Sequence, residues 1–158
     1  MCYSAEAWSL YDNYVKEYSA DIDIRSFWEI YLRRDEAYRI RRPASEIPKI
    51  PKGMDFNFLH PRNDQEQEIK ALIDSYNAGV VMSSEQEMFK QAKRVADAER
   101  KLAVKETKAA LNDVRVGGSK VKQMKRWIAD AKRTTVEPER DNRIWPDWYL
   151  PVLMVEDG

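Results

Sequence analysis

The sequence predicts an α+β chain that is mainly helical, with a long antiparallel helical hairpin over residues 84 to 133 and a β-strand near its carboxyl end. Apolar residues recur every three or four positions through most of the chain, as they do on the buried face of a helix. The stretch from Ser84 to about Val114 is rich in helix-forming residues and contains neither Pro nor Gly. The run Val152-Leu153-Met154-Val155 has the length and the content of β-branched residues that are typical of a buried strand. A chain of 158 residues is the size of one domain, so we expect a single domain over residues 1 to 158.

Two amphipathic helices are expected before residue 40, one capped by Ser4 and one capped by Asp23. Five prolines and glycines between residues 43 and 61 then predict an ordered loop without regular helix. A third short helix begins at the capping-box pattern of Asp64 with Gln67, and Gly79 is expected to end it.

The hairpin follows from a second capping-box pattern, Ser84 with Glu87. The helix that starts there is expected to break at Gly117-Gly118, and a second helix returns to about Arg133. A polar linker over residues 134 to 142 leads into the strand region of residues 144 to 158. Because no other segment is a convincing strand, we expect the missing strands to come from a continuation of the chain or, equally, from a partner chain.

Positive charge is concentrated in the hairpin. The formal net charge of the chain is zero, yet residues 85 to 133 carry 14 Lys and Arg against 7 Asp and Glu. Such a surplus attracts a polyanion, although a charged outer face also keeps a long hairpin soluble. The candidate DNA-contacting residues are Arg94, Lys101, Lys105, Lys108, Lys122, Lys125 and Arg126.

The composition argues against several other classes of protein. Cys2 is the sole cysteine and His60 the sole histidine, so the sequence predicts no internal disulfide and no metal site. We found neither a secretory signal pattern nor 18 consecutive apolar residues, and we therefore expect no membrane span. A reducing, cytoplasmic location is the default expectation for such a chain.

Cys2 is the candidate catalytic residue, because removal of Met1 would place an α-amine and a thiol on the same carbon. Both groups have reference pKa values near 8, so a useful fraction of each is nucleophilic close to neutral pH. An aldehyde that meets such a group forms a Schiff base, which the thiolate closes into a five-membered thiazolidine. The alternative is that Cys2 is an inert small hydrophobic residue, as most lone cysteines are.

Four stretches of the sequence together resemble the SOS-response-associated peptidase (SRAP) family. They are Met1-Cys2, Asp21 to Glu29, Met88 to Leu111, and Arg143 to Gly158. The resemblance is to the longer bacterial branch, and it covers the N-terminal portion of the family domain with residues 84 to 133 as a helical insertion. It implies a mixed β-containing fold, and the capture chemistry expected of Cys2 needs no metal and no other cofactor. It also implies that Cys2 captures the aldehyde of an abasic site in single-stranded DNA as a covalent DNA–protein crosslink.

Three interpretations remain open at this point. In the first, the chain is a DNA-lesion-capturing enzyme of SRAP type, with crosslinking, autopeptidase or lyase activity, completed by further strands from a partner or a continuation. In the second, it is a DNA- or protein-binding helical module in which Cys2 takes no part. In the third, it is a fragment without activity of its own.

Overall fold

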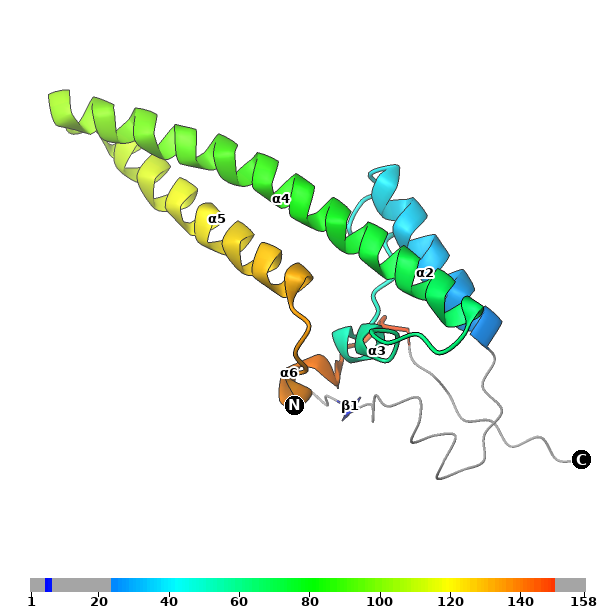
Figure 1. Cartoon of the computed structure of the whole chain (residues 1–158). Coiled ribbons are helices and arrows are strands. Elements are labelled where there is room, and N and C mark those ends of the chain that lie inside the picture. The colour runs from blue at the N-terminus through cyan, green and yellow to red at the C-terminus, as the bar shows by residue number, and fades with distance from the viewer. Residues whose placement is uncertain (1–4, 7–23, 150–158) are drawn as a thin grey trace, which may run out of the picture. The chain divides into compact units, whose positions relative to one another are not determined.

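A computed structural model of the chain describes residues 5 and 6 and residues 24 to 149. The elements in chain order are β1 (Ala5–Glu6), α2 (Ile24–Arg39), α3 (Lys52–Phe56), α4 (Asp64–Val104), α5 (Lys108–Lys132), α6 (Pro138–Asp141) and β2 (Arg143–Ile144) (Figure 1). The expectation of a mainly helical chain is confirmed. The described residues form two compact units, one up to Tyr76 together with the residues from Thr134 onward, and one over Asn77–Arg133. None of the described helices has the length and apolar character needed to cross a bilayer.

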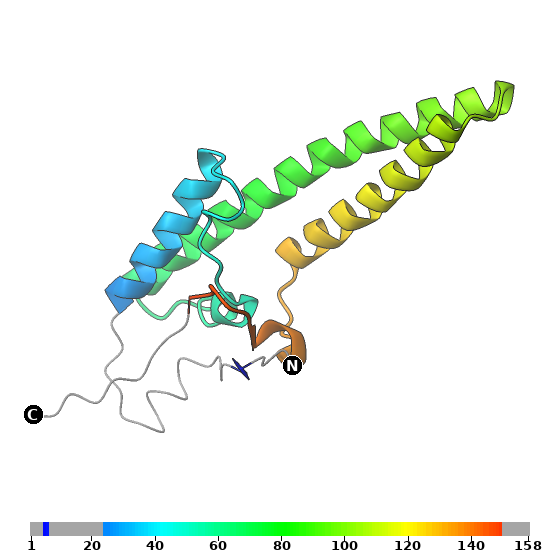
Figure 2. The same cartoon turned by 180° about the vertical axis from the view of Figure 1, so that it is seen from behind.

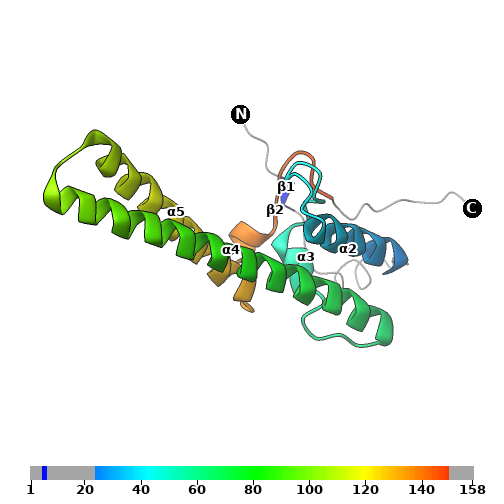
Figure 3. The same ribbon diagram turned by 90° about the horizontal axis from the view of Figure 1, so that it is seen from above.

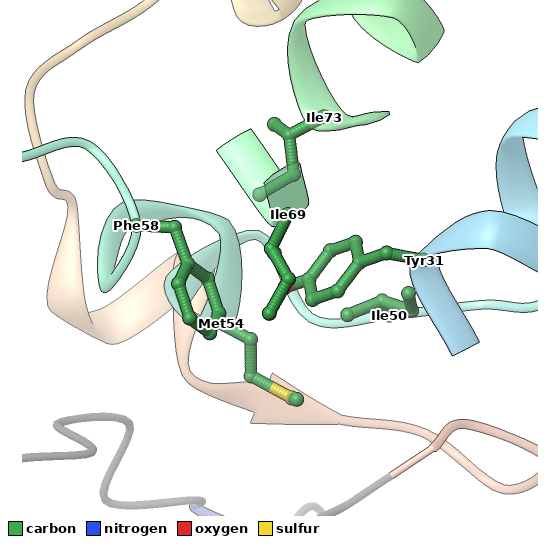
Figure 4. Packing of buried hydrophobic residues seen from close by; sticks show 6 residues of the cluster. All are labelled: Tyr31, Ile50, Met54, Phe58, Ile69 and Ile73. Atoms are coloured by element: carbon green, nitrogen blue, oxygen red, sulfur yellow. The ribbon is translucent and has the colours of Figure 1, made fainter. Parts of the chain in front are cut away.

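The first unit has an apolar core that joins α2, α3 and the first turns of α4. Tyr31 of α2 meets Phe58 edge to face, with ring centroids 5.7 Å apart. Figure 4 shows how these rings and the surrounding aliphatic side chains converge. The six buried residues of this cluster are Tyr31, Ile50, Met54, Phe58, Ile69 and Ile73. Three of them come from the proline-rich segment, which is therefore an ordered part of the core as expected, although it contains the short helix α3 that was not expected.

The strands of the first unit are short. β1 pairs antiparallel with β2 (Figure 3). In this pairing Ala5 lies opposite Ile144. Beyond β2, the backbone N–H of Tyr149 donates to the carbonyl of Lys49 at 2.9 Å. The expectation that a helix capped by Ser4 would include Ala5 and Glu6 is wrong, because a partner strand more than 130 residues away sets their conformation. The remainder of that expected helix and the expected strand at residues 152 to 155 lie outside the described residues.

Helix α4 is continuous from Asp64 to Val104, so the expected end at Gly79 and the expected start at Ser84 are both wrong. One interior Gly costs a helix only about 1 kcal/mol relative to Ala, which the packing of a long helix offsets. The N-terminal cap also lies one residue earlier than predicted, since the Asn63 side chain accepts a hydrogen bond from the Glu66 N–H at 2.9 Å.

The hairpin of α4 and α5 is present, but its turn lies at residues 105 to 107 and not at Gly117-Gly118. Figures 2 and 3 show α5 returning along the second half of α4. Thr107 caps α5, and its hydroxyl accepts a hydrogen bond from the N–H of Ala110 at 3.3 Å. Gly117 lies inside α5 because the helices approach closely there: a Cβ atom at Gly117 would stand 2.7 Å from Cγ2 of Val95. The expected linker after α5 likewise contains the short helix α6.

Candidate nucleic-acid interface

The buried seam of the hairpin repeats every seven residues, with alternating steps of four and three. In α4 the seam is Val81, Ser84, Met88, Gln91, Val95, Ala98 and Leu102, all buried or half-buried. In α5 it is Ala110, Val114, Gly117, Val121, Met124, Ile128 and Ala131, again all buried or half-buried. This pattern is that of an antiparallel two-helix coiled coil. The seam therefore determines which face of each helix points to solvent.

Two ion pairs connect α4 and α5, one on each flank of the seam. The guanidinium of Arg94 contacts the carboxylate of Asp113 on one flank. On the other flank, Lys132 Nζ lies 3.6 Å from Glu85 Oε1. Ion pairs at these flanking positions set the orientation and register of a coiled coil, and Arg94 is part of that arrangement.

Five cations share one face of α5 on the side away from the seam, and we call this set the basic face. Its members are Lys108, Arg115, Lys122, Lys125 and Arg126, all of them exposed. Lys108, Arg115 and Lys122 are spaced seven residues apart, and Lys125 and Arg126 follow at three and four. From Lys108 to Arg126 the face runs for about 27 Å at 1.5 Å per residue.

No carboxylate interrupts the basic face. The positions between its cations are Leu111, Asn112, Gly118, Ser119 and Ala129. Within the part of the chain that the structure describes, Lys108, Lys122, Lys125 and Arg126 form no ion pair, and Arg115 donates a hydrogen bond to Asn112 Oδ1 at 2.8 Å. Neighbouring cations without counter-charges produce a positive potential that attracts a polyanion.

The structure brings together four of the seven predicted DNA-contacting residues on the basic face: Lys108, Lys122, Lys125 and Arg126. Lys101 and Lys105 are exposed at the turn end of the hairpin, and neither forms an ion pair with another described residue. Arg94 differs, because its charge is balanced by Asp113. Arg115 was missed by the sequence prediction, although its spacing of seven residues from both Lys108 and Lys122 is the signal that could have found it.

The first unit contains a buried polar cluster centred on Arg34. Its Nη1 atom lies 3.1 Å from Asp55 Oδ1, and both side chains are almost fully buried. The guanidinium also lies over two rings, 4.8 Å from the centroid of Tyr31 and 4.4 Å from that of Tyr76. Such stacking contributes about 2 kcal/mol where the groups are desolvated.

The electrostatics of this cluster favour a structural role. Burial, reinforced by the charge of Asp55, raises the pKa of Tyr31 well above its ordinary value. Burial also raises the pKa of Tyr76, and the opposing effect of Arg34 does not cancel it. For Arg34, burial lowers the pKa, but Asp55 and the two tyrosines outweigh it, so the net pKa is raised. Neither tyrosine nor Arg34 can therefore exchange a proton near neutral pH.

The described residues do not include Cys2, and they contain no candidate metal site. Cys2 lies outside them, three residues before β1 in the chain. Over residues 24 to 149, no group of three or more His, Cys, Asp or Glu is arranged to hold a metal ion. The basic face is therefore the candidate site that the structure itself defines.

The chain matches no protein-family model, no curated protein and no solved structure. The candidate interface therefore rests on the charge and geometry of the described residues. The aminothiol chemistry of Cys2 rests on the sequence.

Proposed function

We propose that this chain binds single-stranded DNA along the basic face of α5 and captures abasic-site aldehydes through Cys2. The observation that carries the proposal is the basic face, which has five exposed cations and no carboxylate among them. Lys and Arg side chains that neutralise phosphates release condensed counterions, which is the main source of sequence-independent affinity for nucleic acid. Contacts to phosphates hold a strand without reading its base sequence, and a protein that recognises a lesion does not need to read that sequence.

The capture step needs only groups that the chain supplies. The α-amine of Cys2 attacks the C1′ aldehyde of the ring-opened abasic sugar, and the resulting carbinolamine loses water to give an imine. The Cys2 sulfur then adds to the imine carbon, and its proton passes to the nitrogen. The product is a thiazolidine, with one water lost overall and no oxidant or metal required. The proposal requires that Met1 is removed, so that the amine of Cys2 is free.

Intact mass spectrometry tests this step directly. The purified chain is incubated with single-stranded DNA that carries one abasic site, and we expect a species with the mass of des-Met protein plus DNA minus one water. The Cys2→Ala variant keeps the amine but lacks the thiol, so we expect it to give no heat-stable adduct. A heat-stable adduct formed equally by Cys2→Ala would contradict the assignment of Cys2 as the capturing residue.

A second candidate function is non-covalent DNA binding. It is favoured by the basic face, whose five cations all lie on α5 and which does not include Cys2. In that case the chain binds intact and abasic strands with equal affinity and forms no covalent product. A binding titration with both strands, followed by denaturing electrophoresis, distinguishes the two functions. A denaturation-resistant product that forms with the abasic strand alone excludes the second candidate.

A further inference from the structure

A second apolar stripe runs along α4 on the side away from the seam, and we call it the outer stripe. Its residues repeat every seven positions and are Met82, Phe89, Ala96 and Ala103, all of them exposed. Phe89 has 70% of its surface exposed and Met82 has 61%. Single exposed apolar residues are normal on a protein surface, but an aligned series at heptad spacing is the pattern of a helix-packing face.

The two flanks of the outer stripe carry opposite charge. On one flank the positions three residues after each stripe residue are Glu85, Ala92 and Glu99. On the other flank the positions four residues after are Gln86, Lys93 and Arg100. Glu85 pairs with Lys132 of its own hairpin and Arg100 with Asp97 of its own helix. The stripe is therefore apolar along its middle, with the charge of Glu99 on one side and that of Lys93 on the other.

We propose that the outer stripe is the contact surface for a second copy of this chain, with the two α4 helices packed in parallel. When identical helices pack in parallel about a two-fold axis, the left flank of one meets the right flank of the other. Glu99 of each copy then lies on the flank that faces Lys93 of its partner copy, and neither residue forms an ion pair with another described residue of its own chain. An antiparallel arrangement would instead place acid against acid and base against base, which is unfavourable.

The size of the stripe suits a two-helix contact. Met82 to Ala103 covers about 32 Å of helix at 1.5 Å per residue. Phe89 and Met82 supply the large side chains, and Ala96 and Ala103 let the helices approach closely at the other end. The contact uses α4, whereas the basic face lies on α5, so this inference does not depend on the proposed binding of DNA.

Sedimentation velocity tests whether the stripe associates. We expect the wild-type chain to change from monomer to dimer as its concentration rises over about 1 to 100 μM. Phe89→Glu places a charge in the middle of the stripe and should shift this midpoint upward by at least tenfold. Val136→Glu alters an exposed apolar residue that lies outside α4 and should leave the midpoint unchanged. A wild-type chain that stays monomeric, or a Phe89→Glu chain that associates like wild type, would overturn the proposal.

Disulfide trapping tests the orientation of the helices. In a Cys2→Ala background, Met82→Cys and Ala96→Cys are made as separate single-cysteine chains and oxidised under mild conditions. Parallel helices bring each position next to the same position of the other copy, so each chain should crosslink to itself. Antiparallel helices centred on Phe89 would bring residue 82 next to residue 96, and a crosslink that forms only in the mixture of the two chains would overturn the parallel arrangement.

Discussion

At the scale of single residues, the buried pair of Arg34 and Asp55 joins α2 to α3 in the first unit. Both side chains lie almost wholly out of water beside the apolar cluster. A buried ion pair is costly to break because removing one partner leaves the other charge desolvated and alone. The stacking of Arg34 on Tyr31 and Tyr76 ties this pair to the aromatic packing of α2 and α4.

Arg34→Met should lower the free energy of unfolding by about 3 to 5 kcal/mol, because the buried Asp55 would lose its closest cation and keep, among the described cations, the more distant Lys52 Nζ at 3.8 Å. Urea denaturation monitored by circular dichroism measures the change. The double variant Arg34→Met with Asp55→Leu removes both buried charges and should recover much of the loss. A double variant that is less stable than Arg34→Met alone would contradict this explanation.

The two tyrosines beside Arg34 predict a pH dependence of stability above their ordinary pKa of 10.0. Burial keeps both hydroxyls protonated in the folded state, whereas the unfolded chain ionises them from about pH 10 upward. The unfolded state then binds fewer protons, so the free energy of unfolding falls by up to about 1.4 kcal/mol per pH unit for each tyrosine. Unfolding titrations at pH 8 to 11 should show this slope.

Tyr31→Phe is the control for that pH dependence. Its hydroxyl is buried beside Asp55, and its removal should change stability at pH 7 by no more than about 1 kcal/mol. The slope above pH 10 should become shallower. An unchanged slope would show that other groups cause the alkaline loss of stability.

At the scale of elements, the two adjacent glycines of α5 differ in their surroundings. A Cβ atom at Gly117 would collide with Val95, whereas one at Gly118 would meet nothing within 4 Å. Neither glycine has a positive φ angle, so the backbone accepts Ala at both positions. Substituting Ala at each glycine in turn therefore distinguishes the effect of close helix packing, at Gly117, from the effect of helix propensity alone, at Gly118.

Gly118→Ala should stabilise the chain by about 1 kcal/mol, because Ala is the better residue in a helix interior. Gly117→Ala gains the same propensity but forces α4 and α5 apart, and we expect a net loss of about 1 to 3 kcal/mol. Thermal unfolding of both variants by circular dichroism measures the difference. Equal stabilisation by both substitutions would show that the helices do not pack closely at Gly117.

The sequence predicted that a hairpin exists but not where it turns. Adjacent glycines are a strong local turn signal, and here the close approach to Val95 outweighs it. The heptad phase could have located the turn, because the α5 seam continues unbroken through Gly117 while the α4 seam ends at Leu102. The β1 strand could not be predicted locally, since its only described strand partner is β2, far along the chain.

At the scale of the whole chain, counting charges identified the basic segment but not its arrangement. Arg94 and Lys122 are equivalent in such a count, yet Arg94 is paired across the hairpin, whereas Lys122 forms no ion pair with another described residue. That difference depends on the register between α4 and α5, which no single-helix pattern contains. Four of the seven predicted residues share the basic face, and the seam periodicity adds Arg115 to them.

The salt dependence of DNA binding tests the central claim, that the basic face holds single-stranded DNA. Fluorescence anisotropy with a labelled single strand is measured over a salt series for wild type and for the triple variant Lys122→Gln, Lys125→Gln, Arg126→Gln. The matched control is Arg25→Gln, Arg42→Gln, Lys70→Gln, which removes three cations from the first unit, each in an exposed or partly exposed ion pair.

We predict that the α5 triple variant loses about 2 units of slope in log K against log salt, and up to about a hundredfold in affinity at 0.1 M salt, at about 0.7 units of slope for each lost phosphate contact. The control variant should keep most of both, because it changes the net charge equally but leaves the basic face intact. Equal losses in the two variants would mean that only the net charge matters and would contradict the assignment of the basic face as the DNA-binding surface.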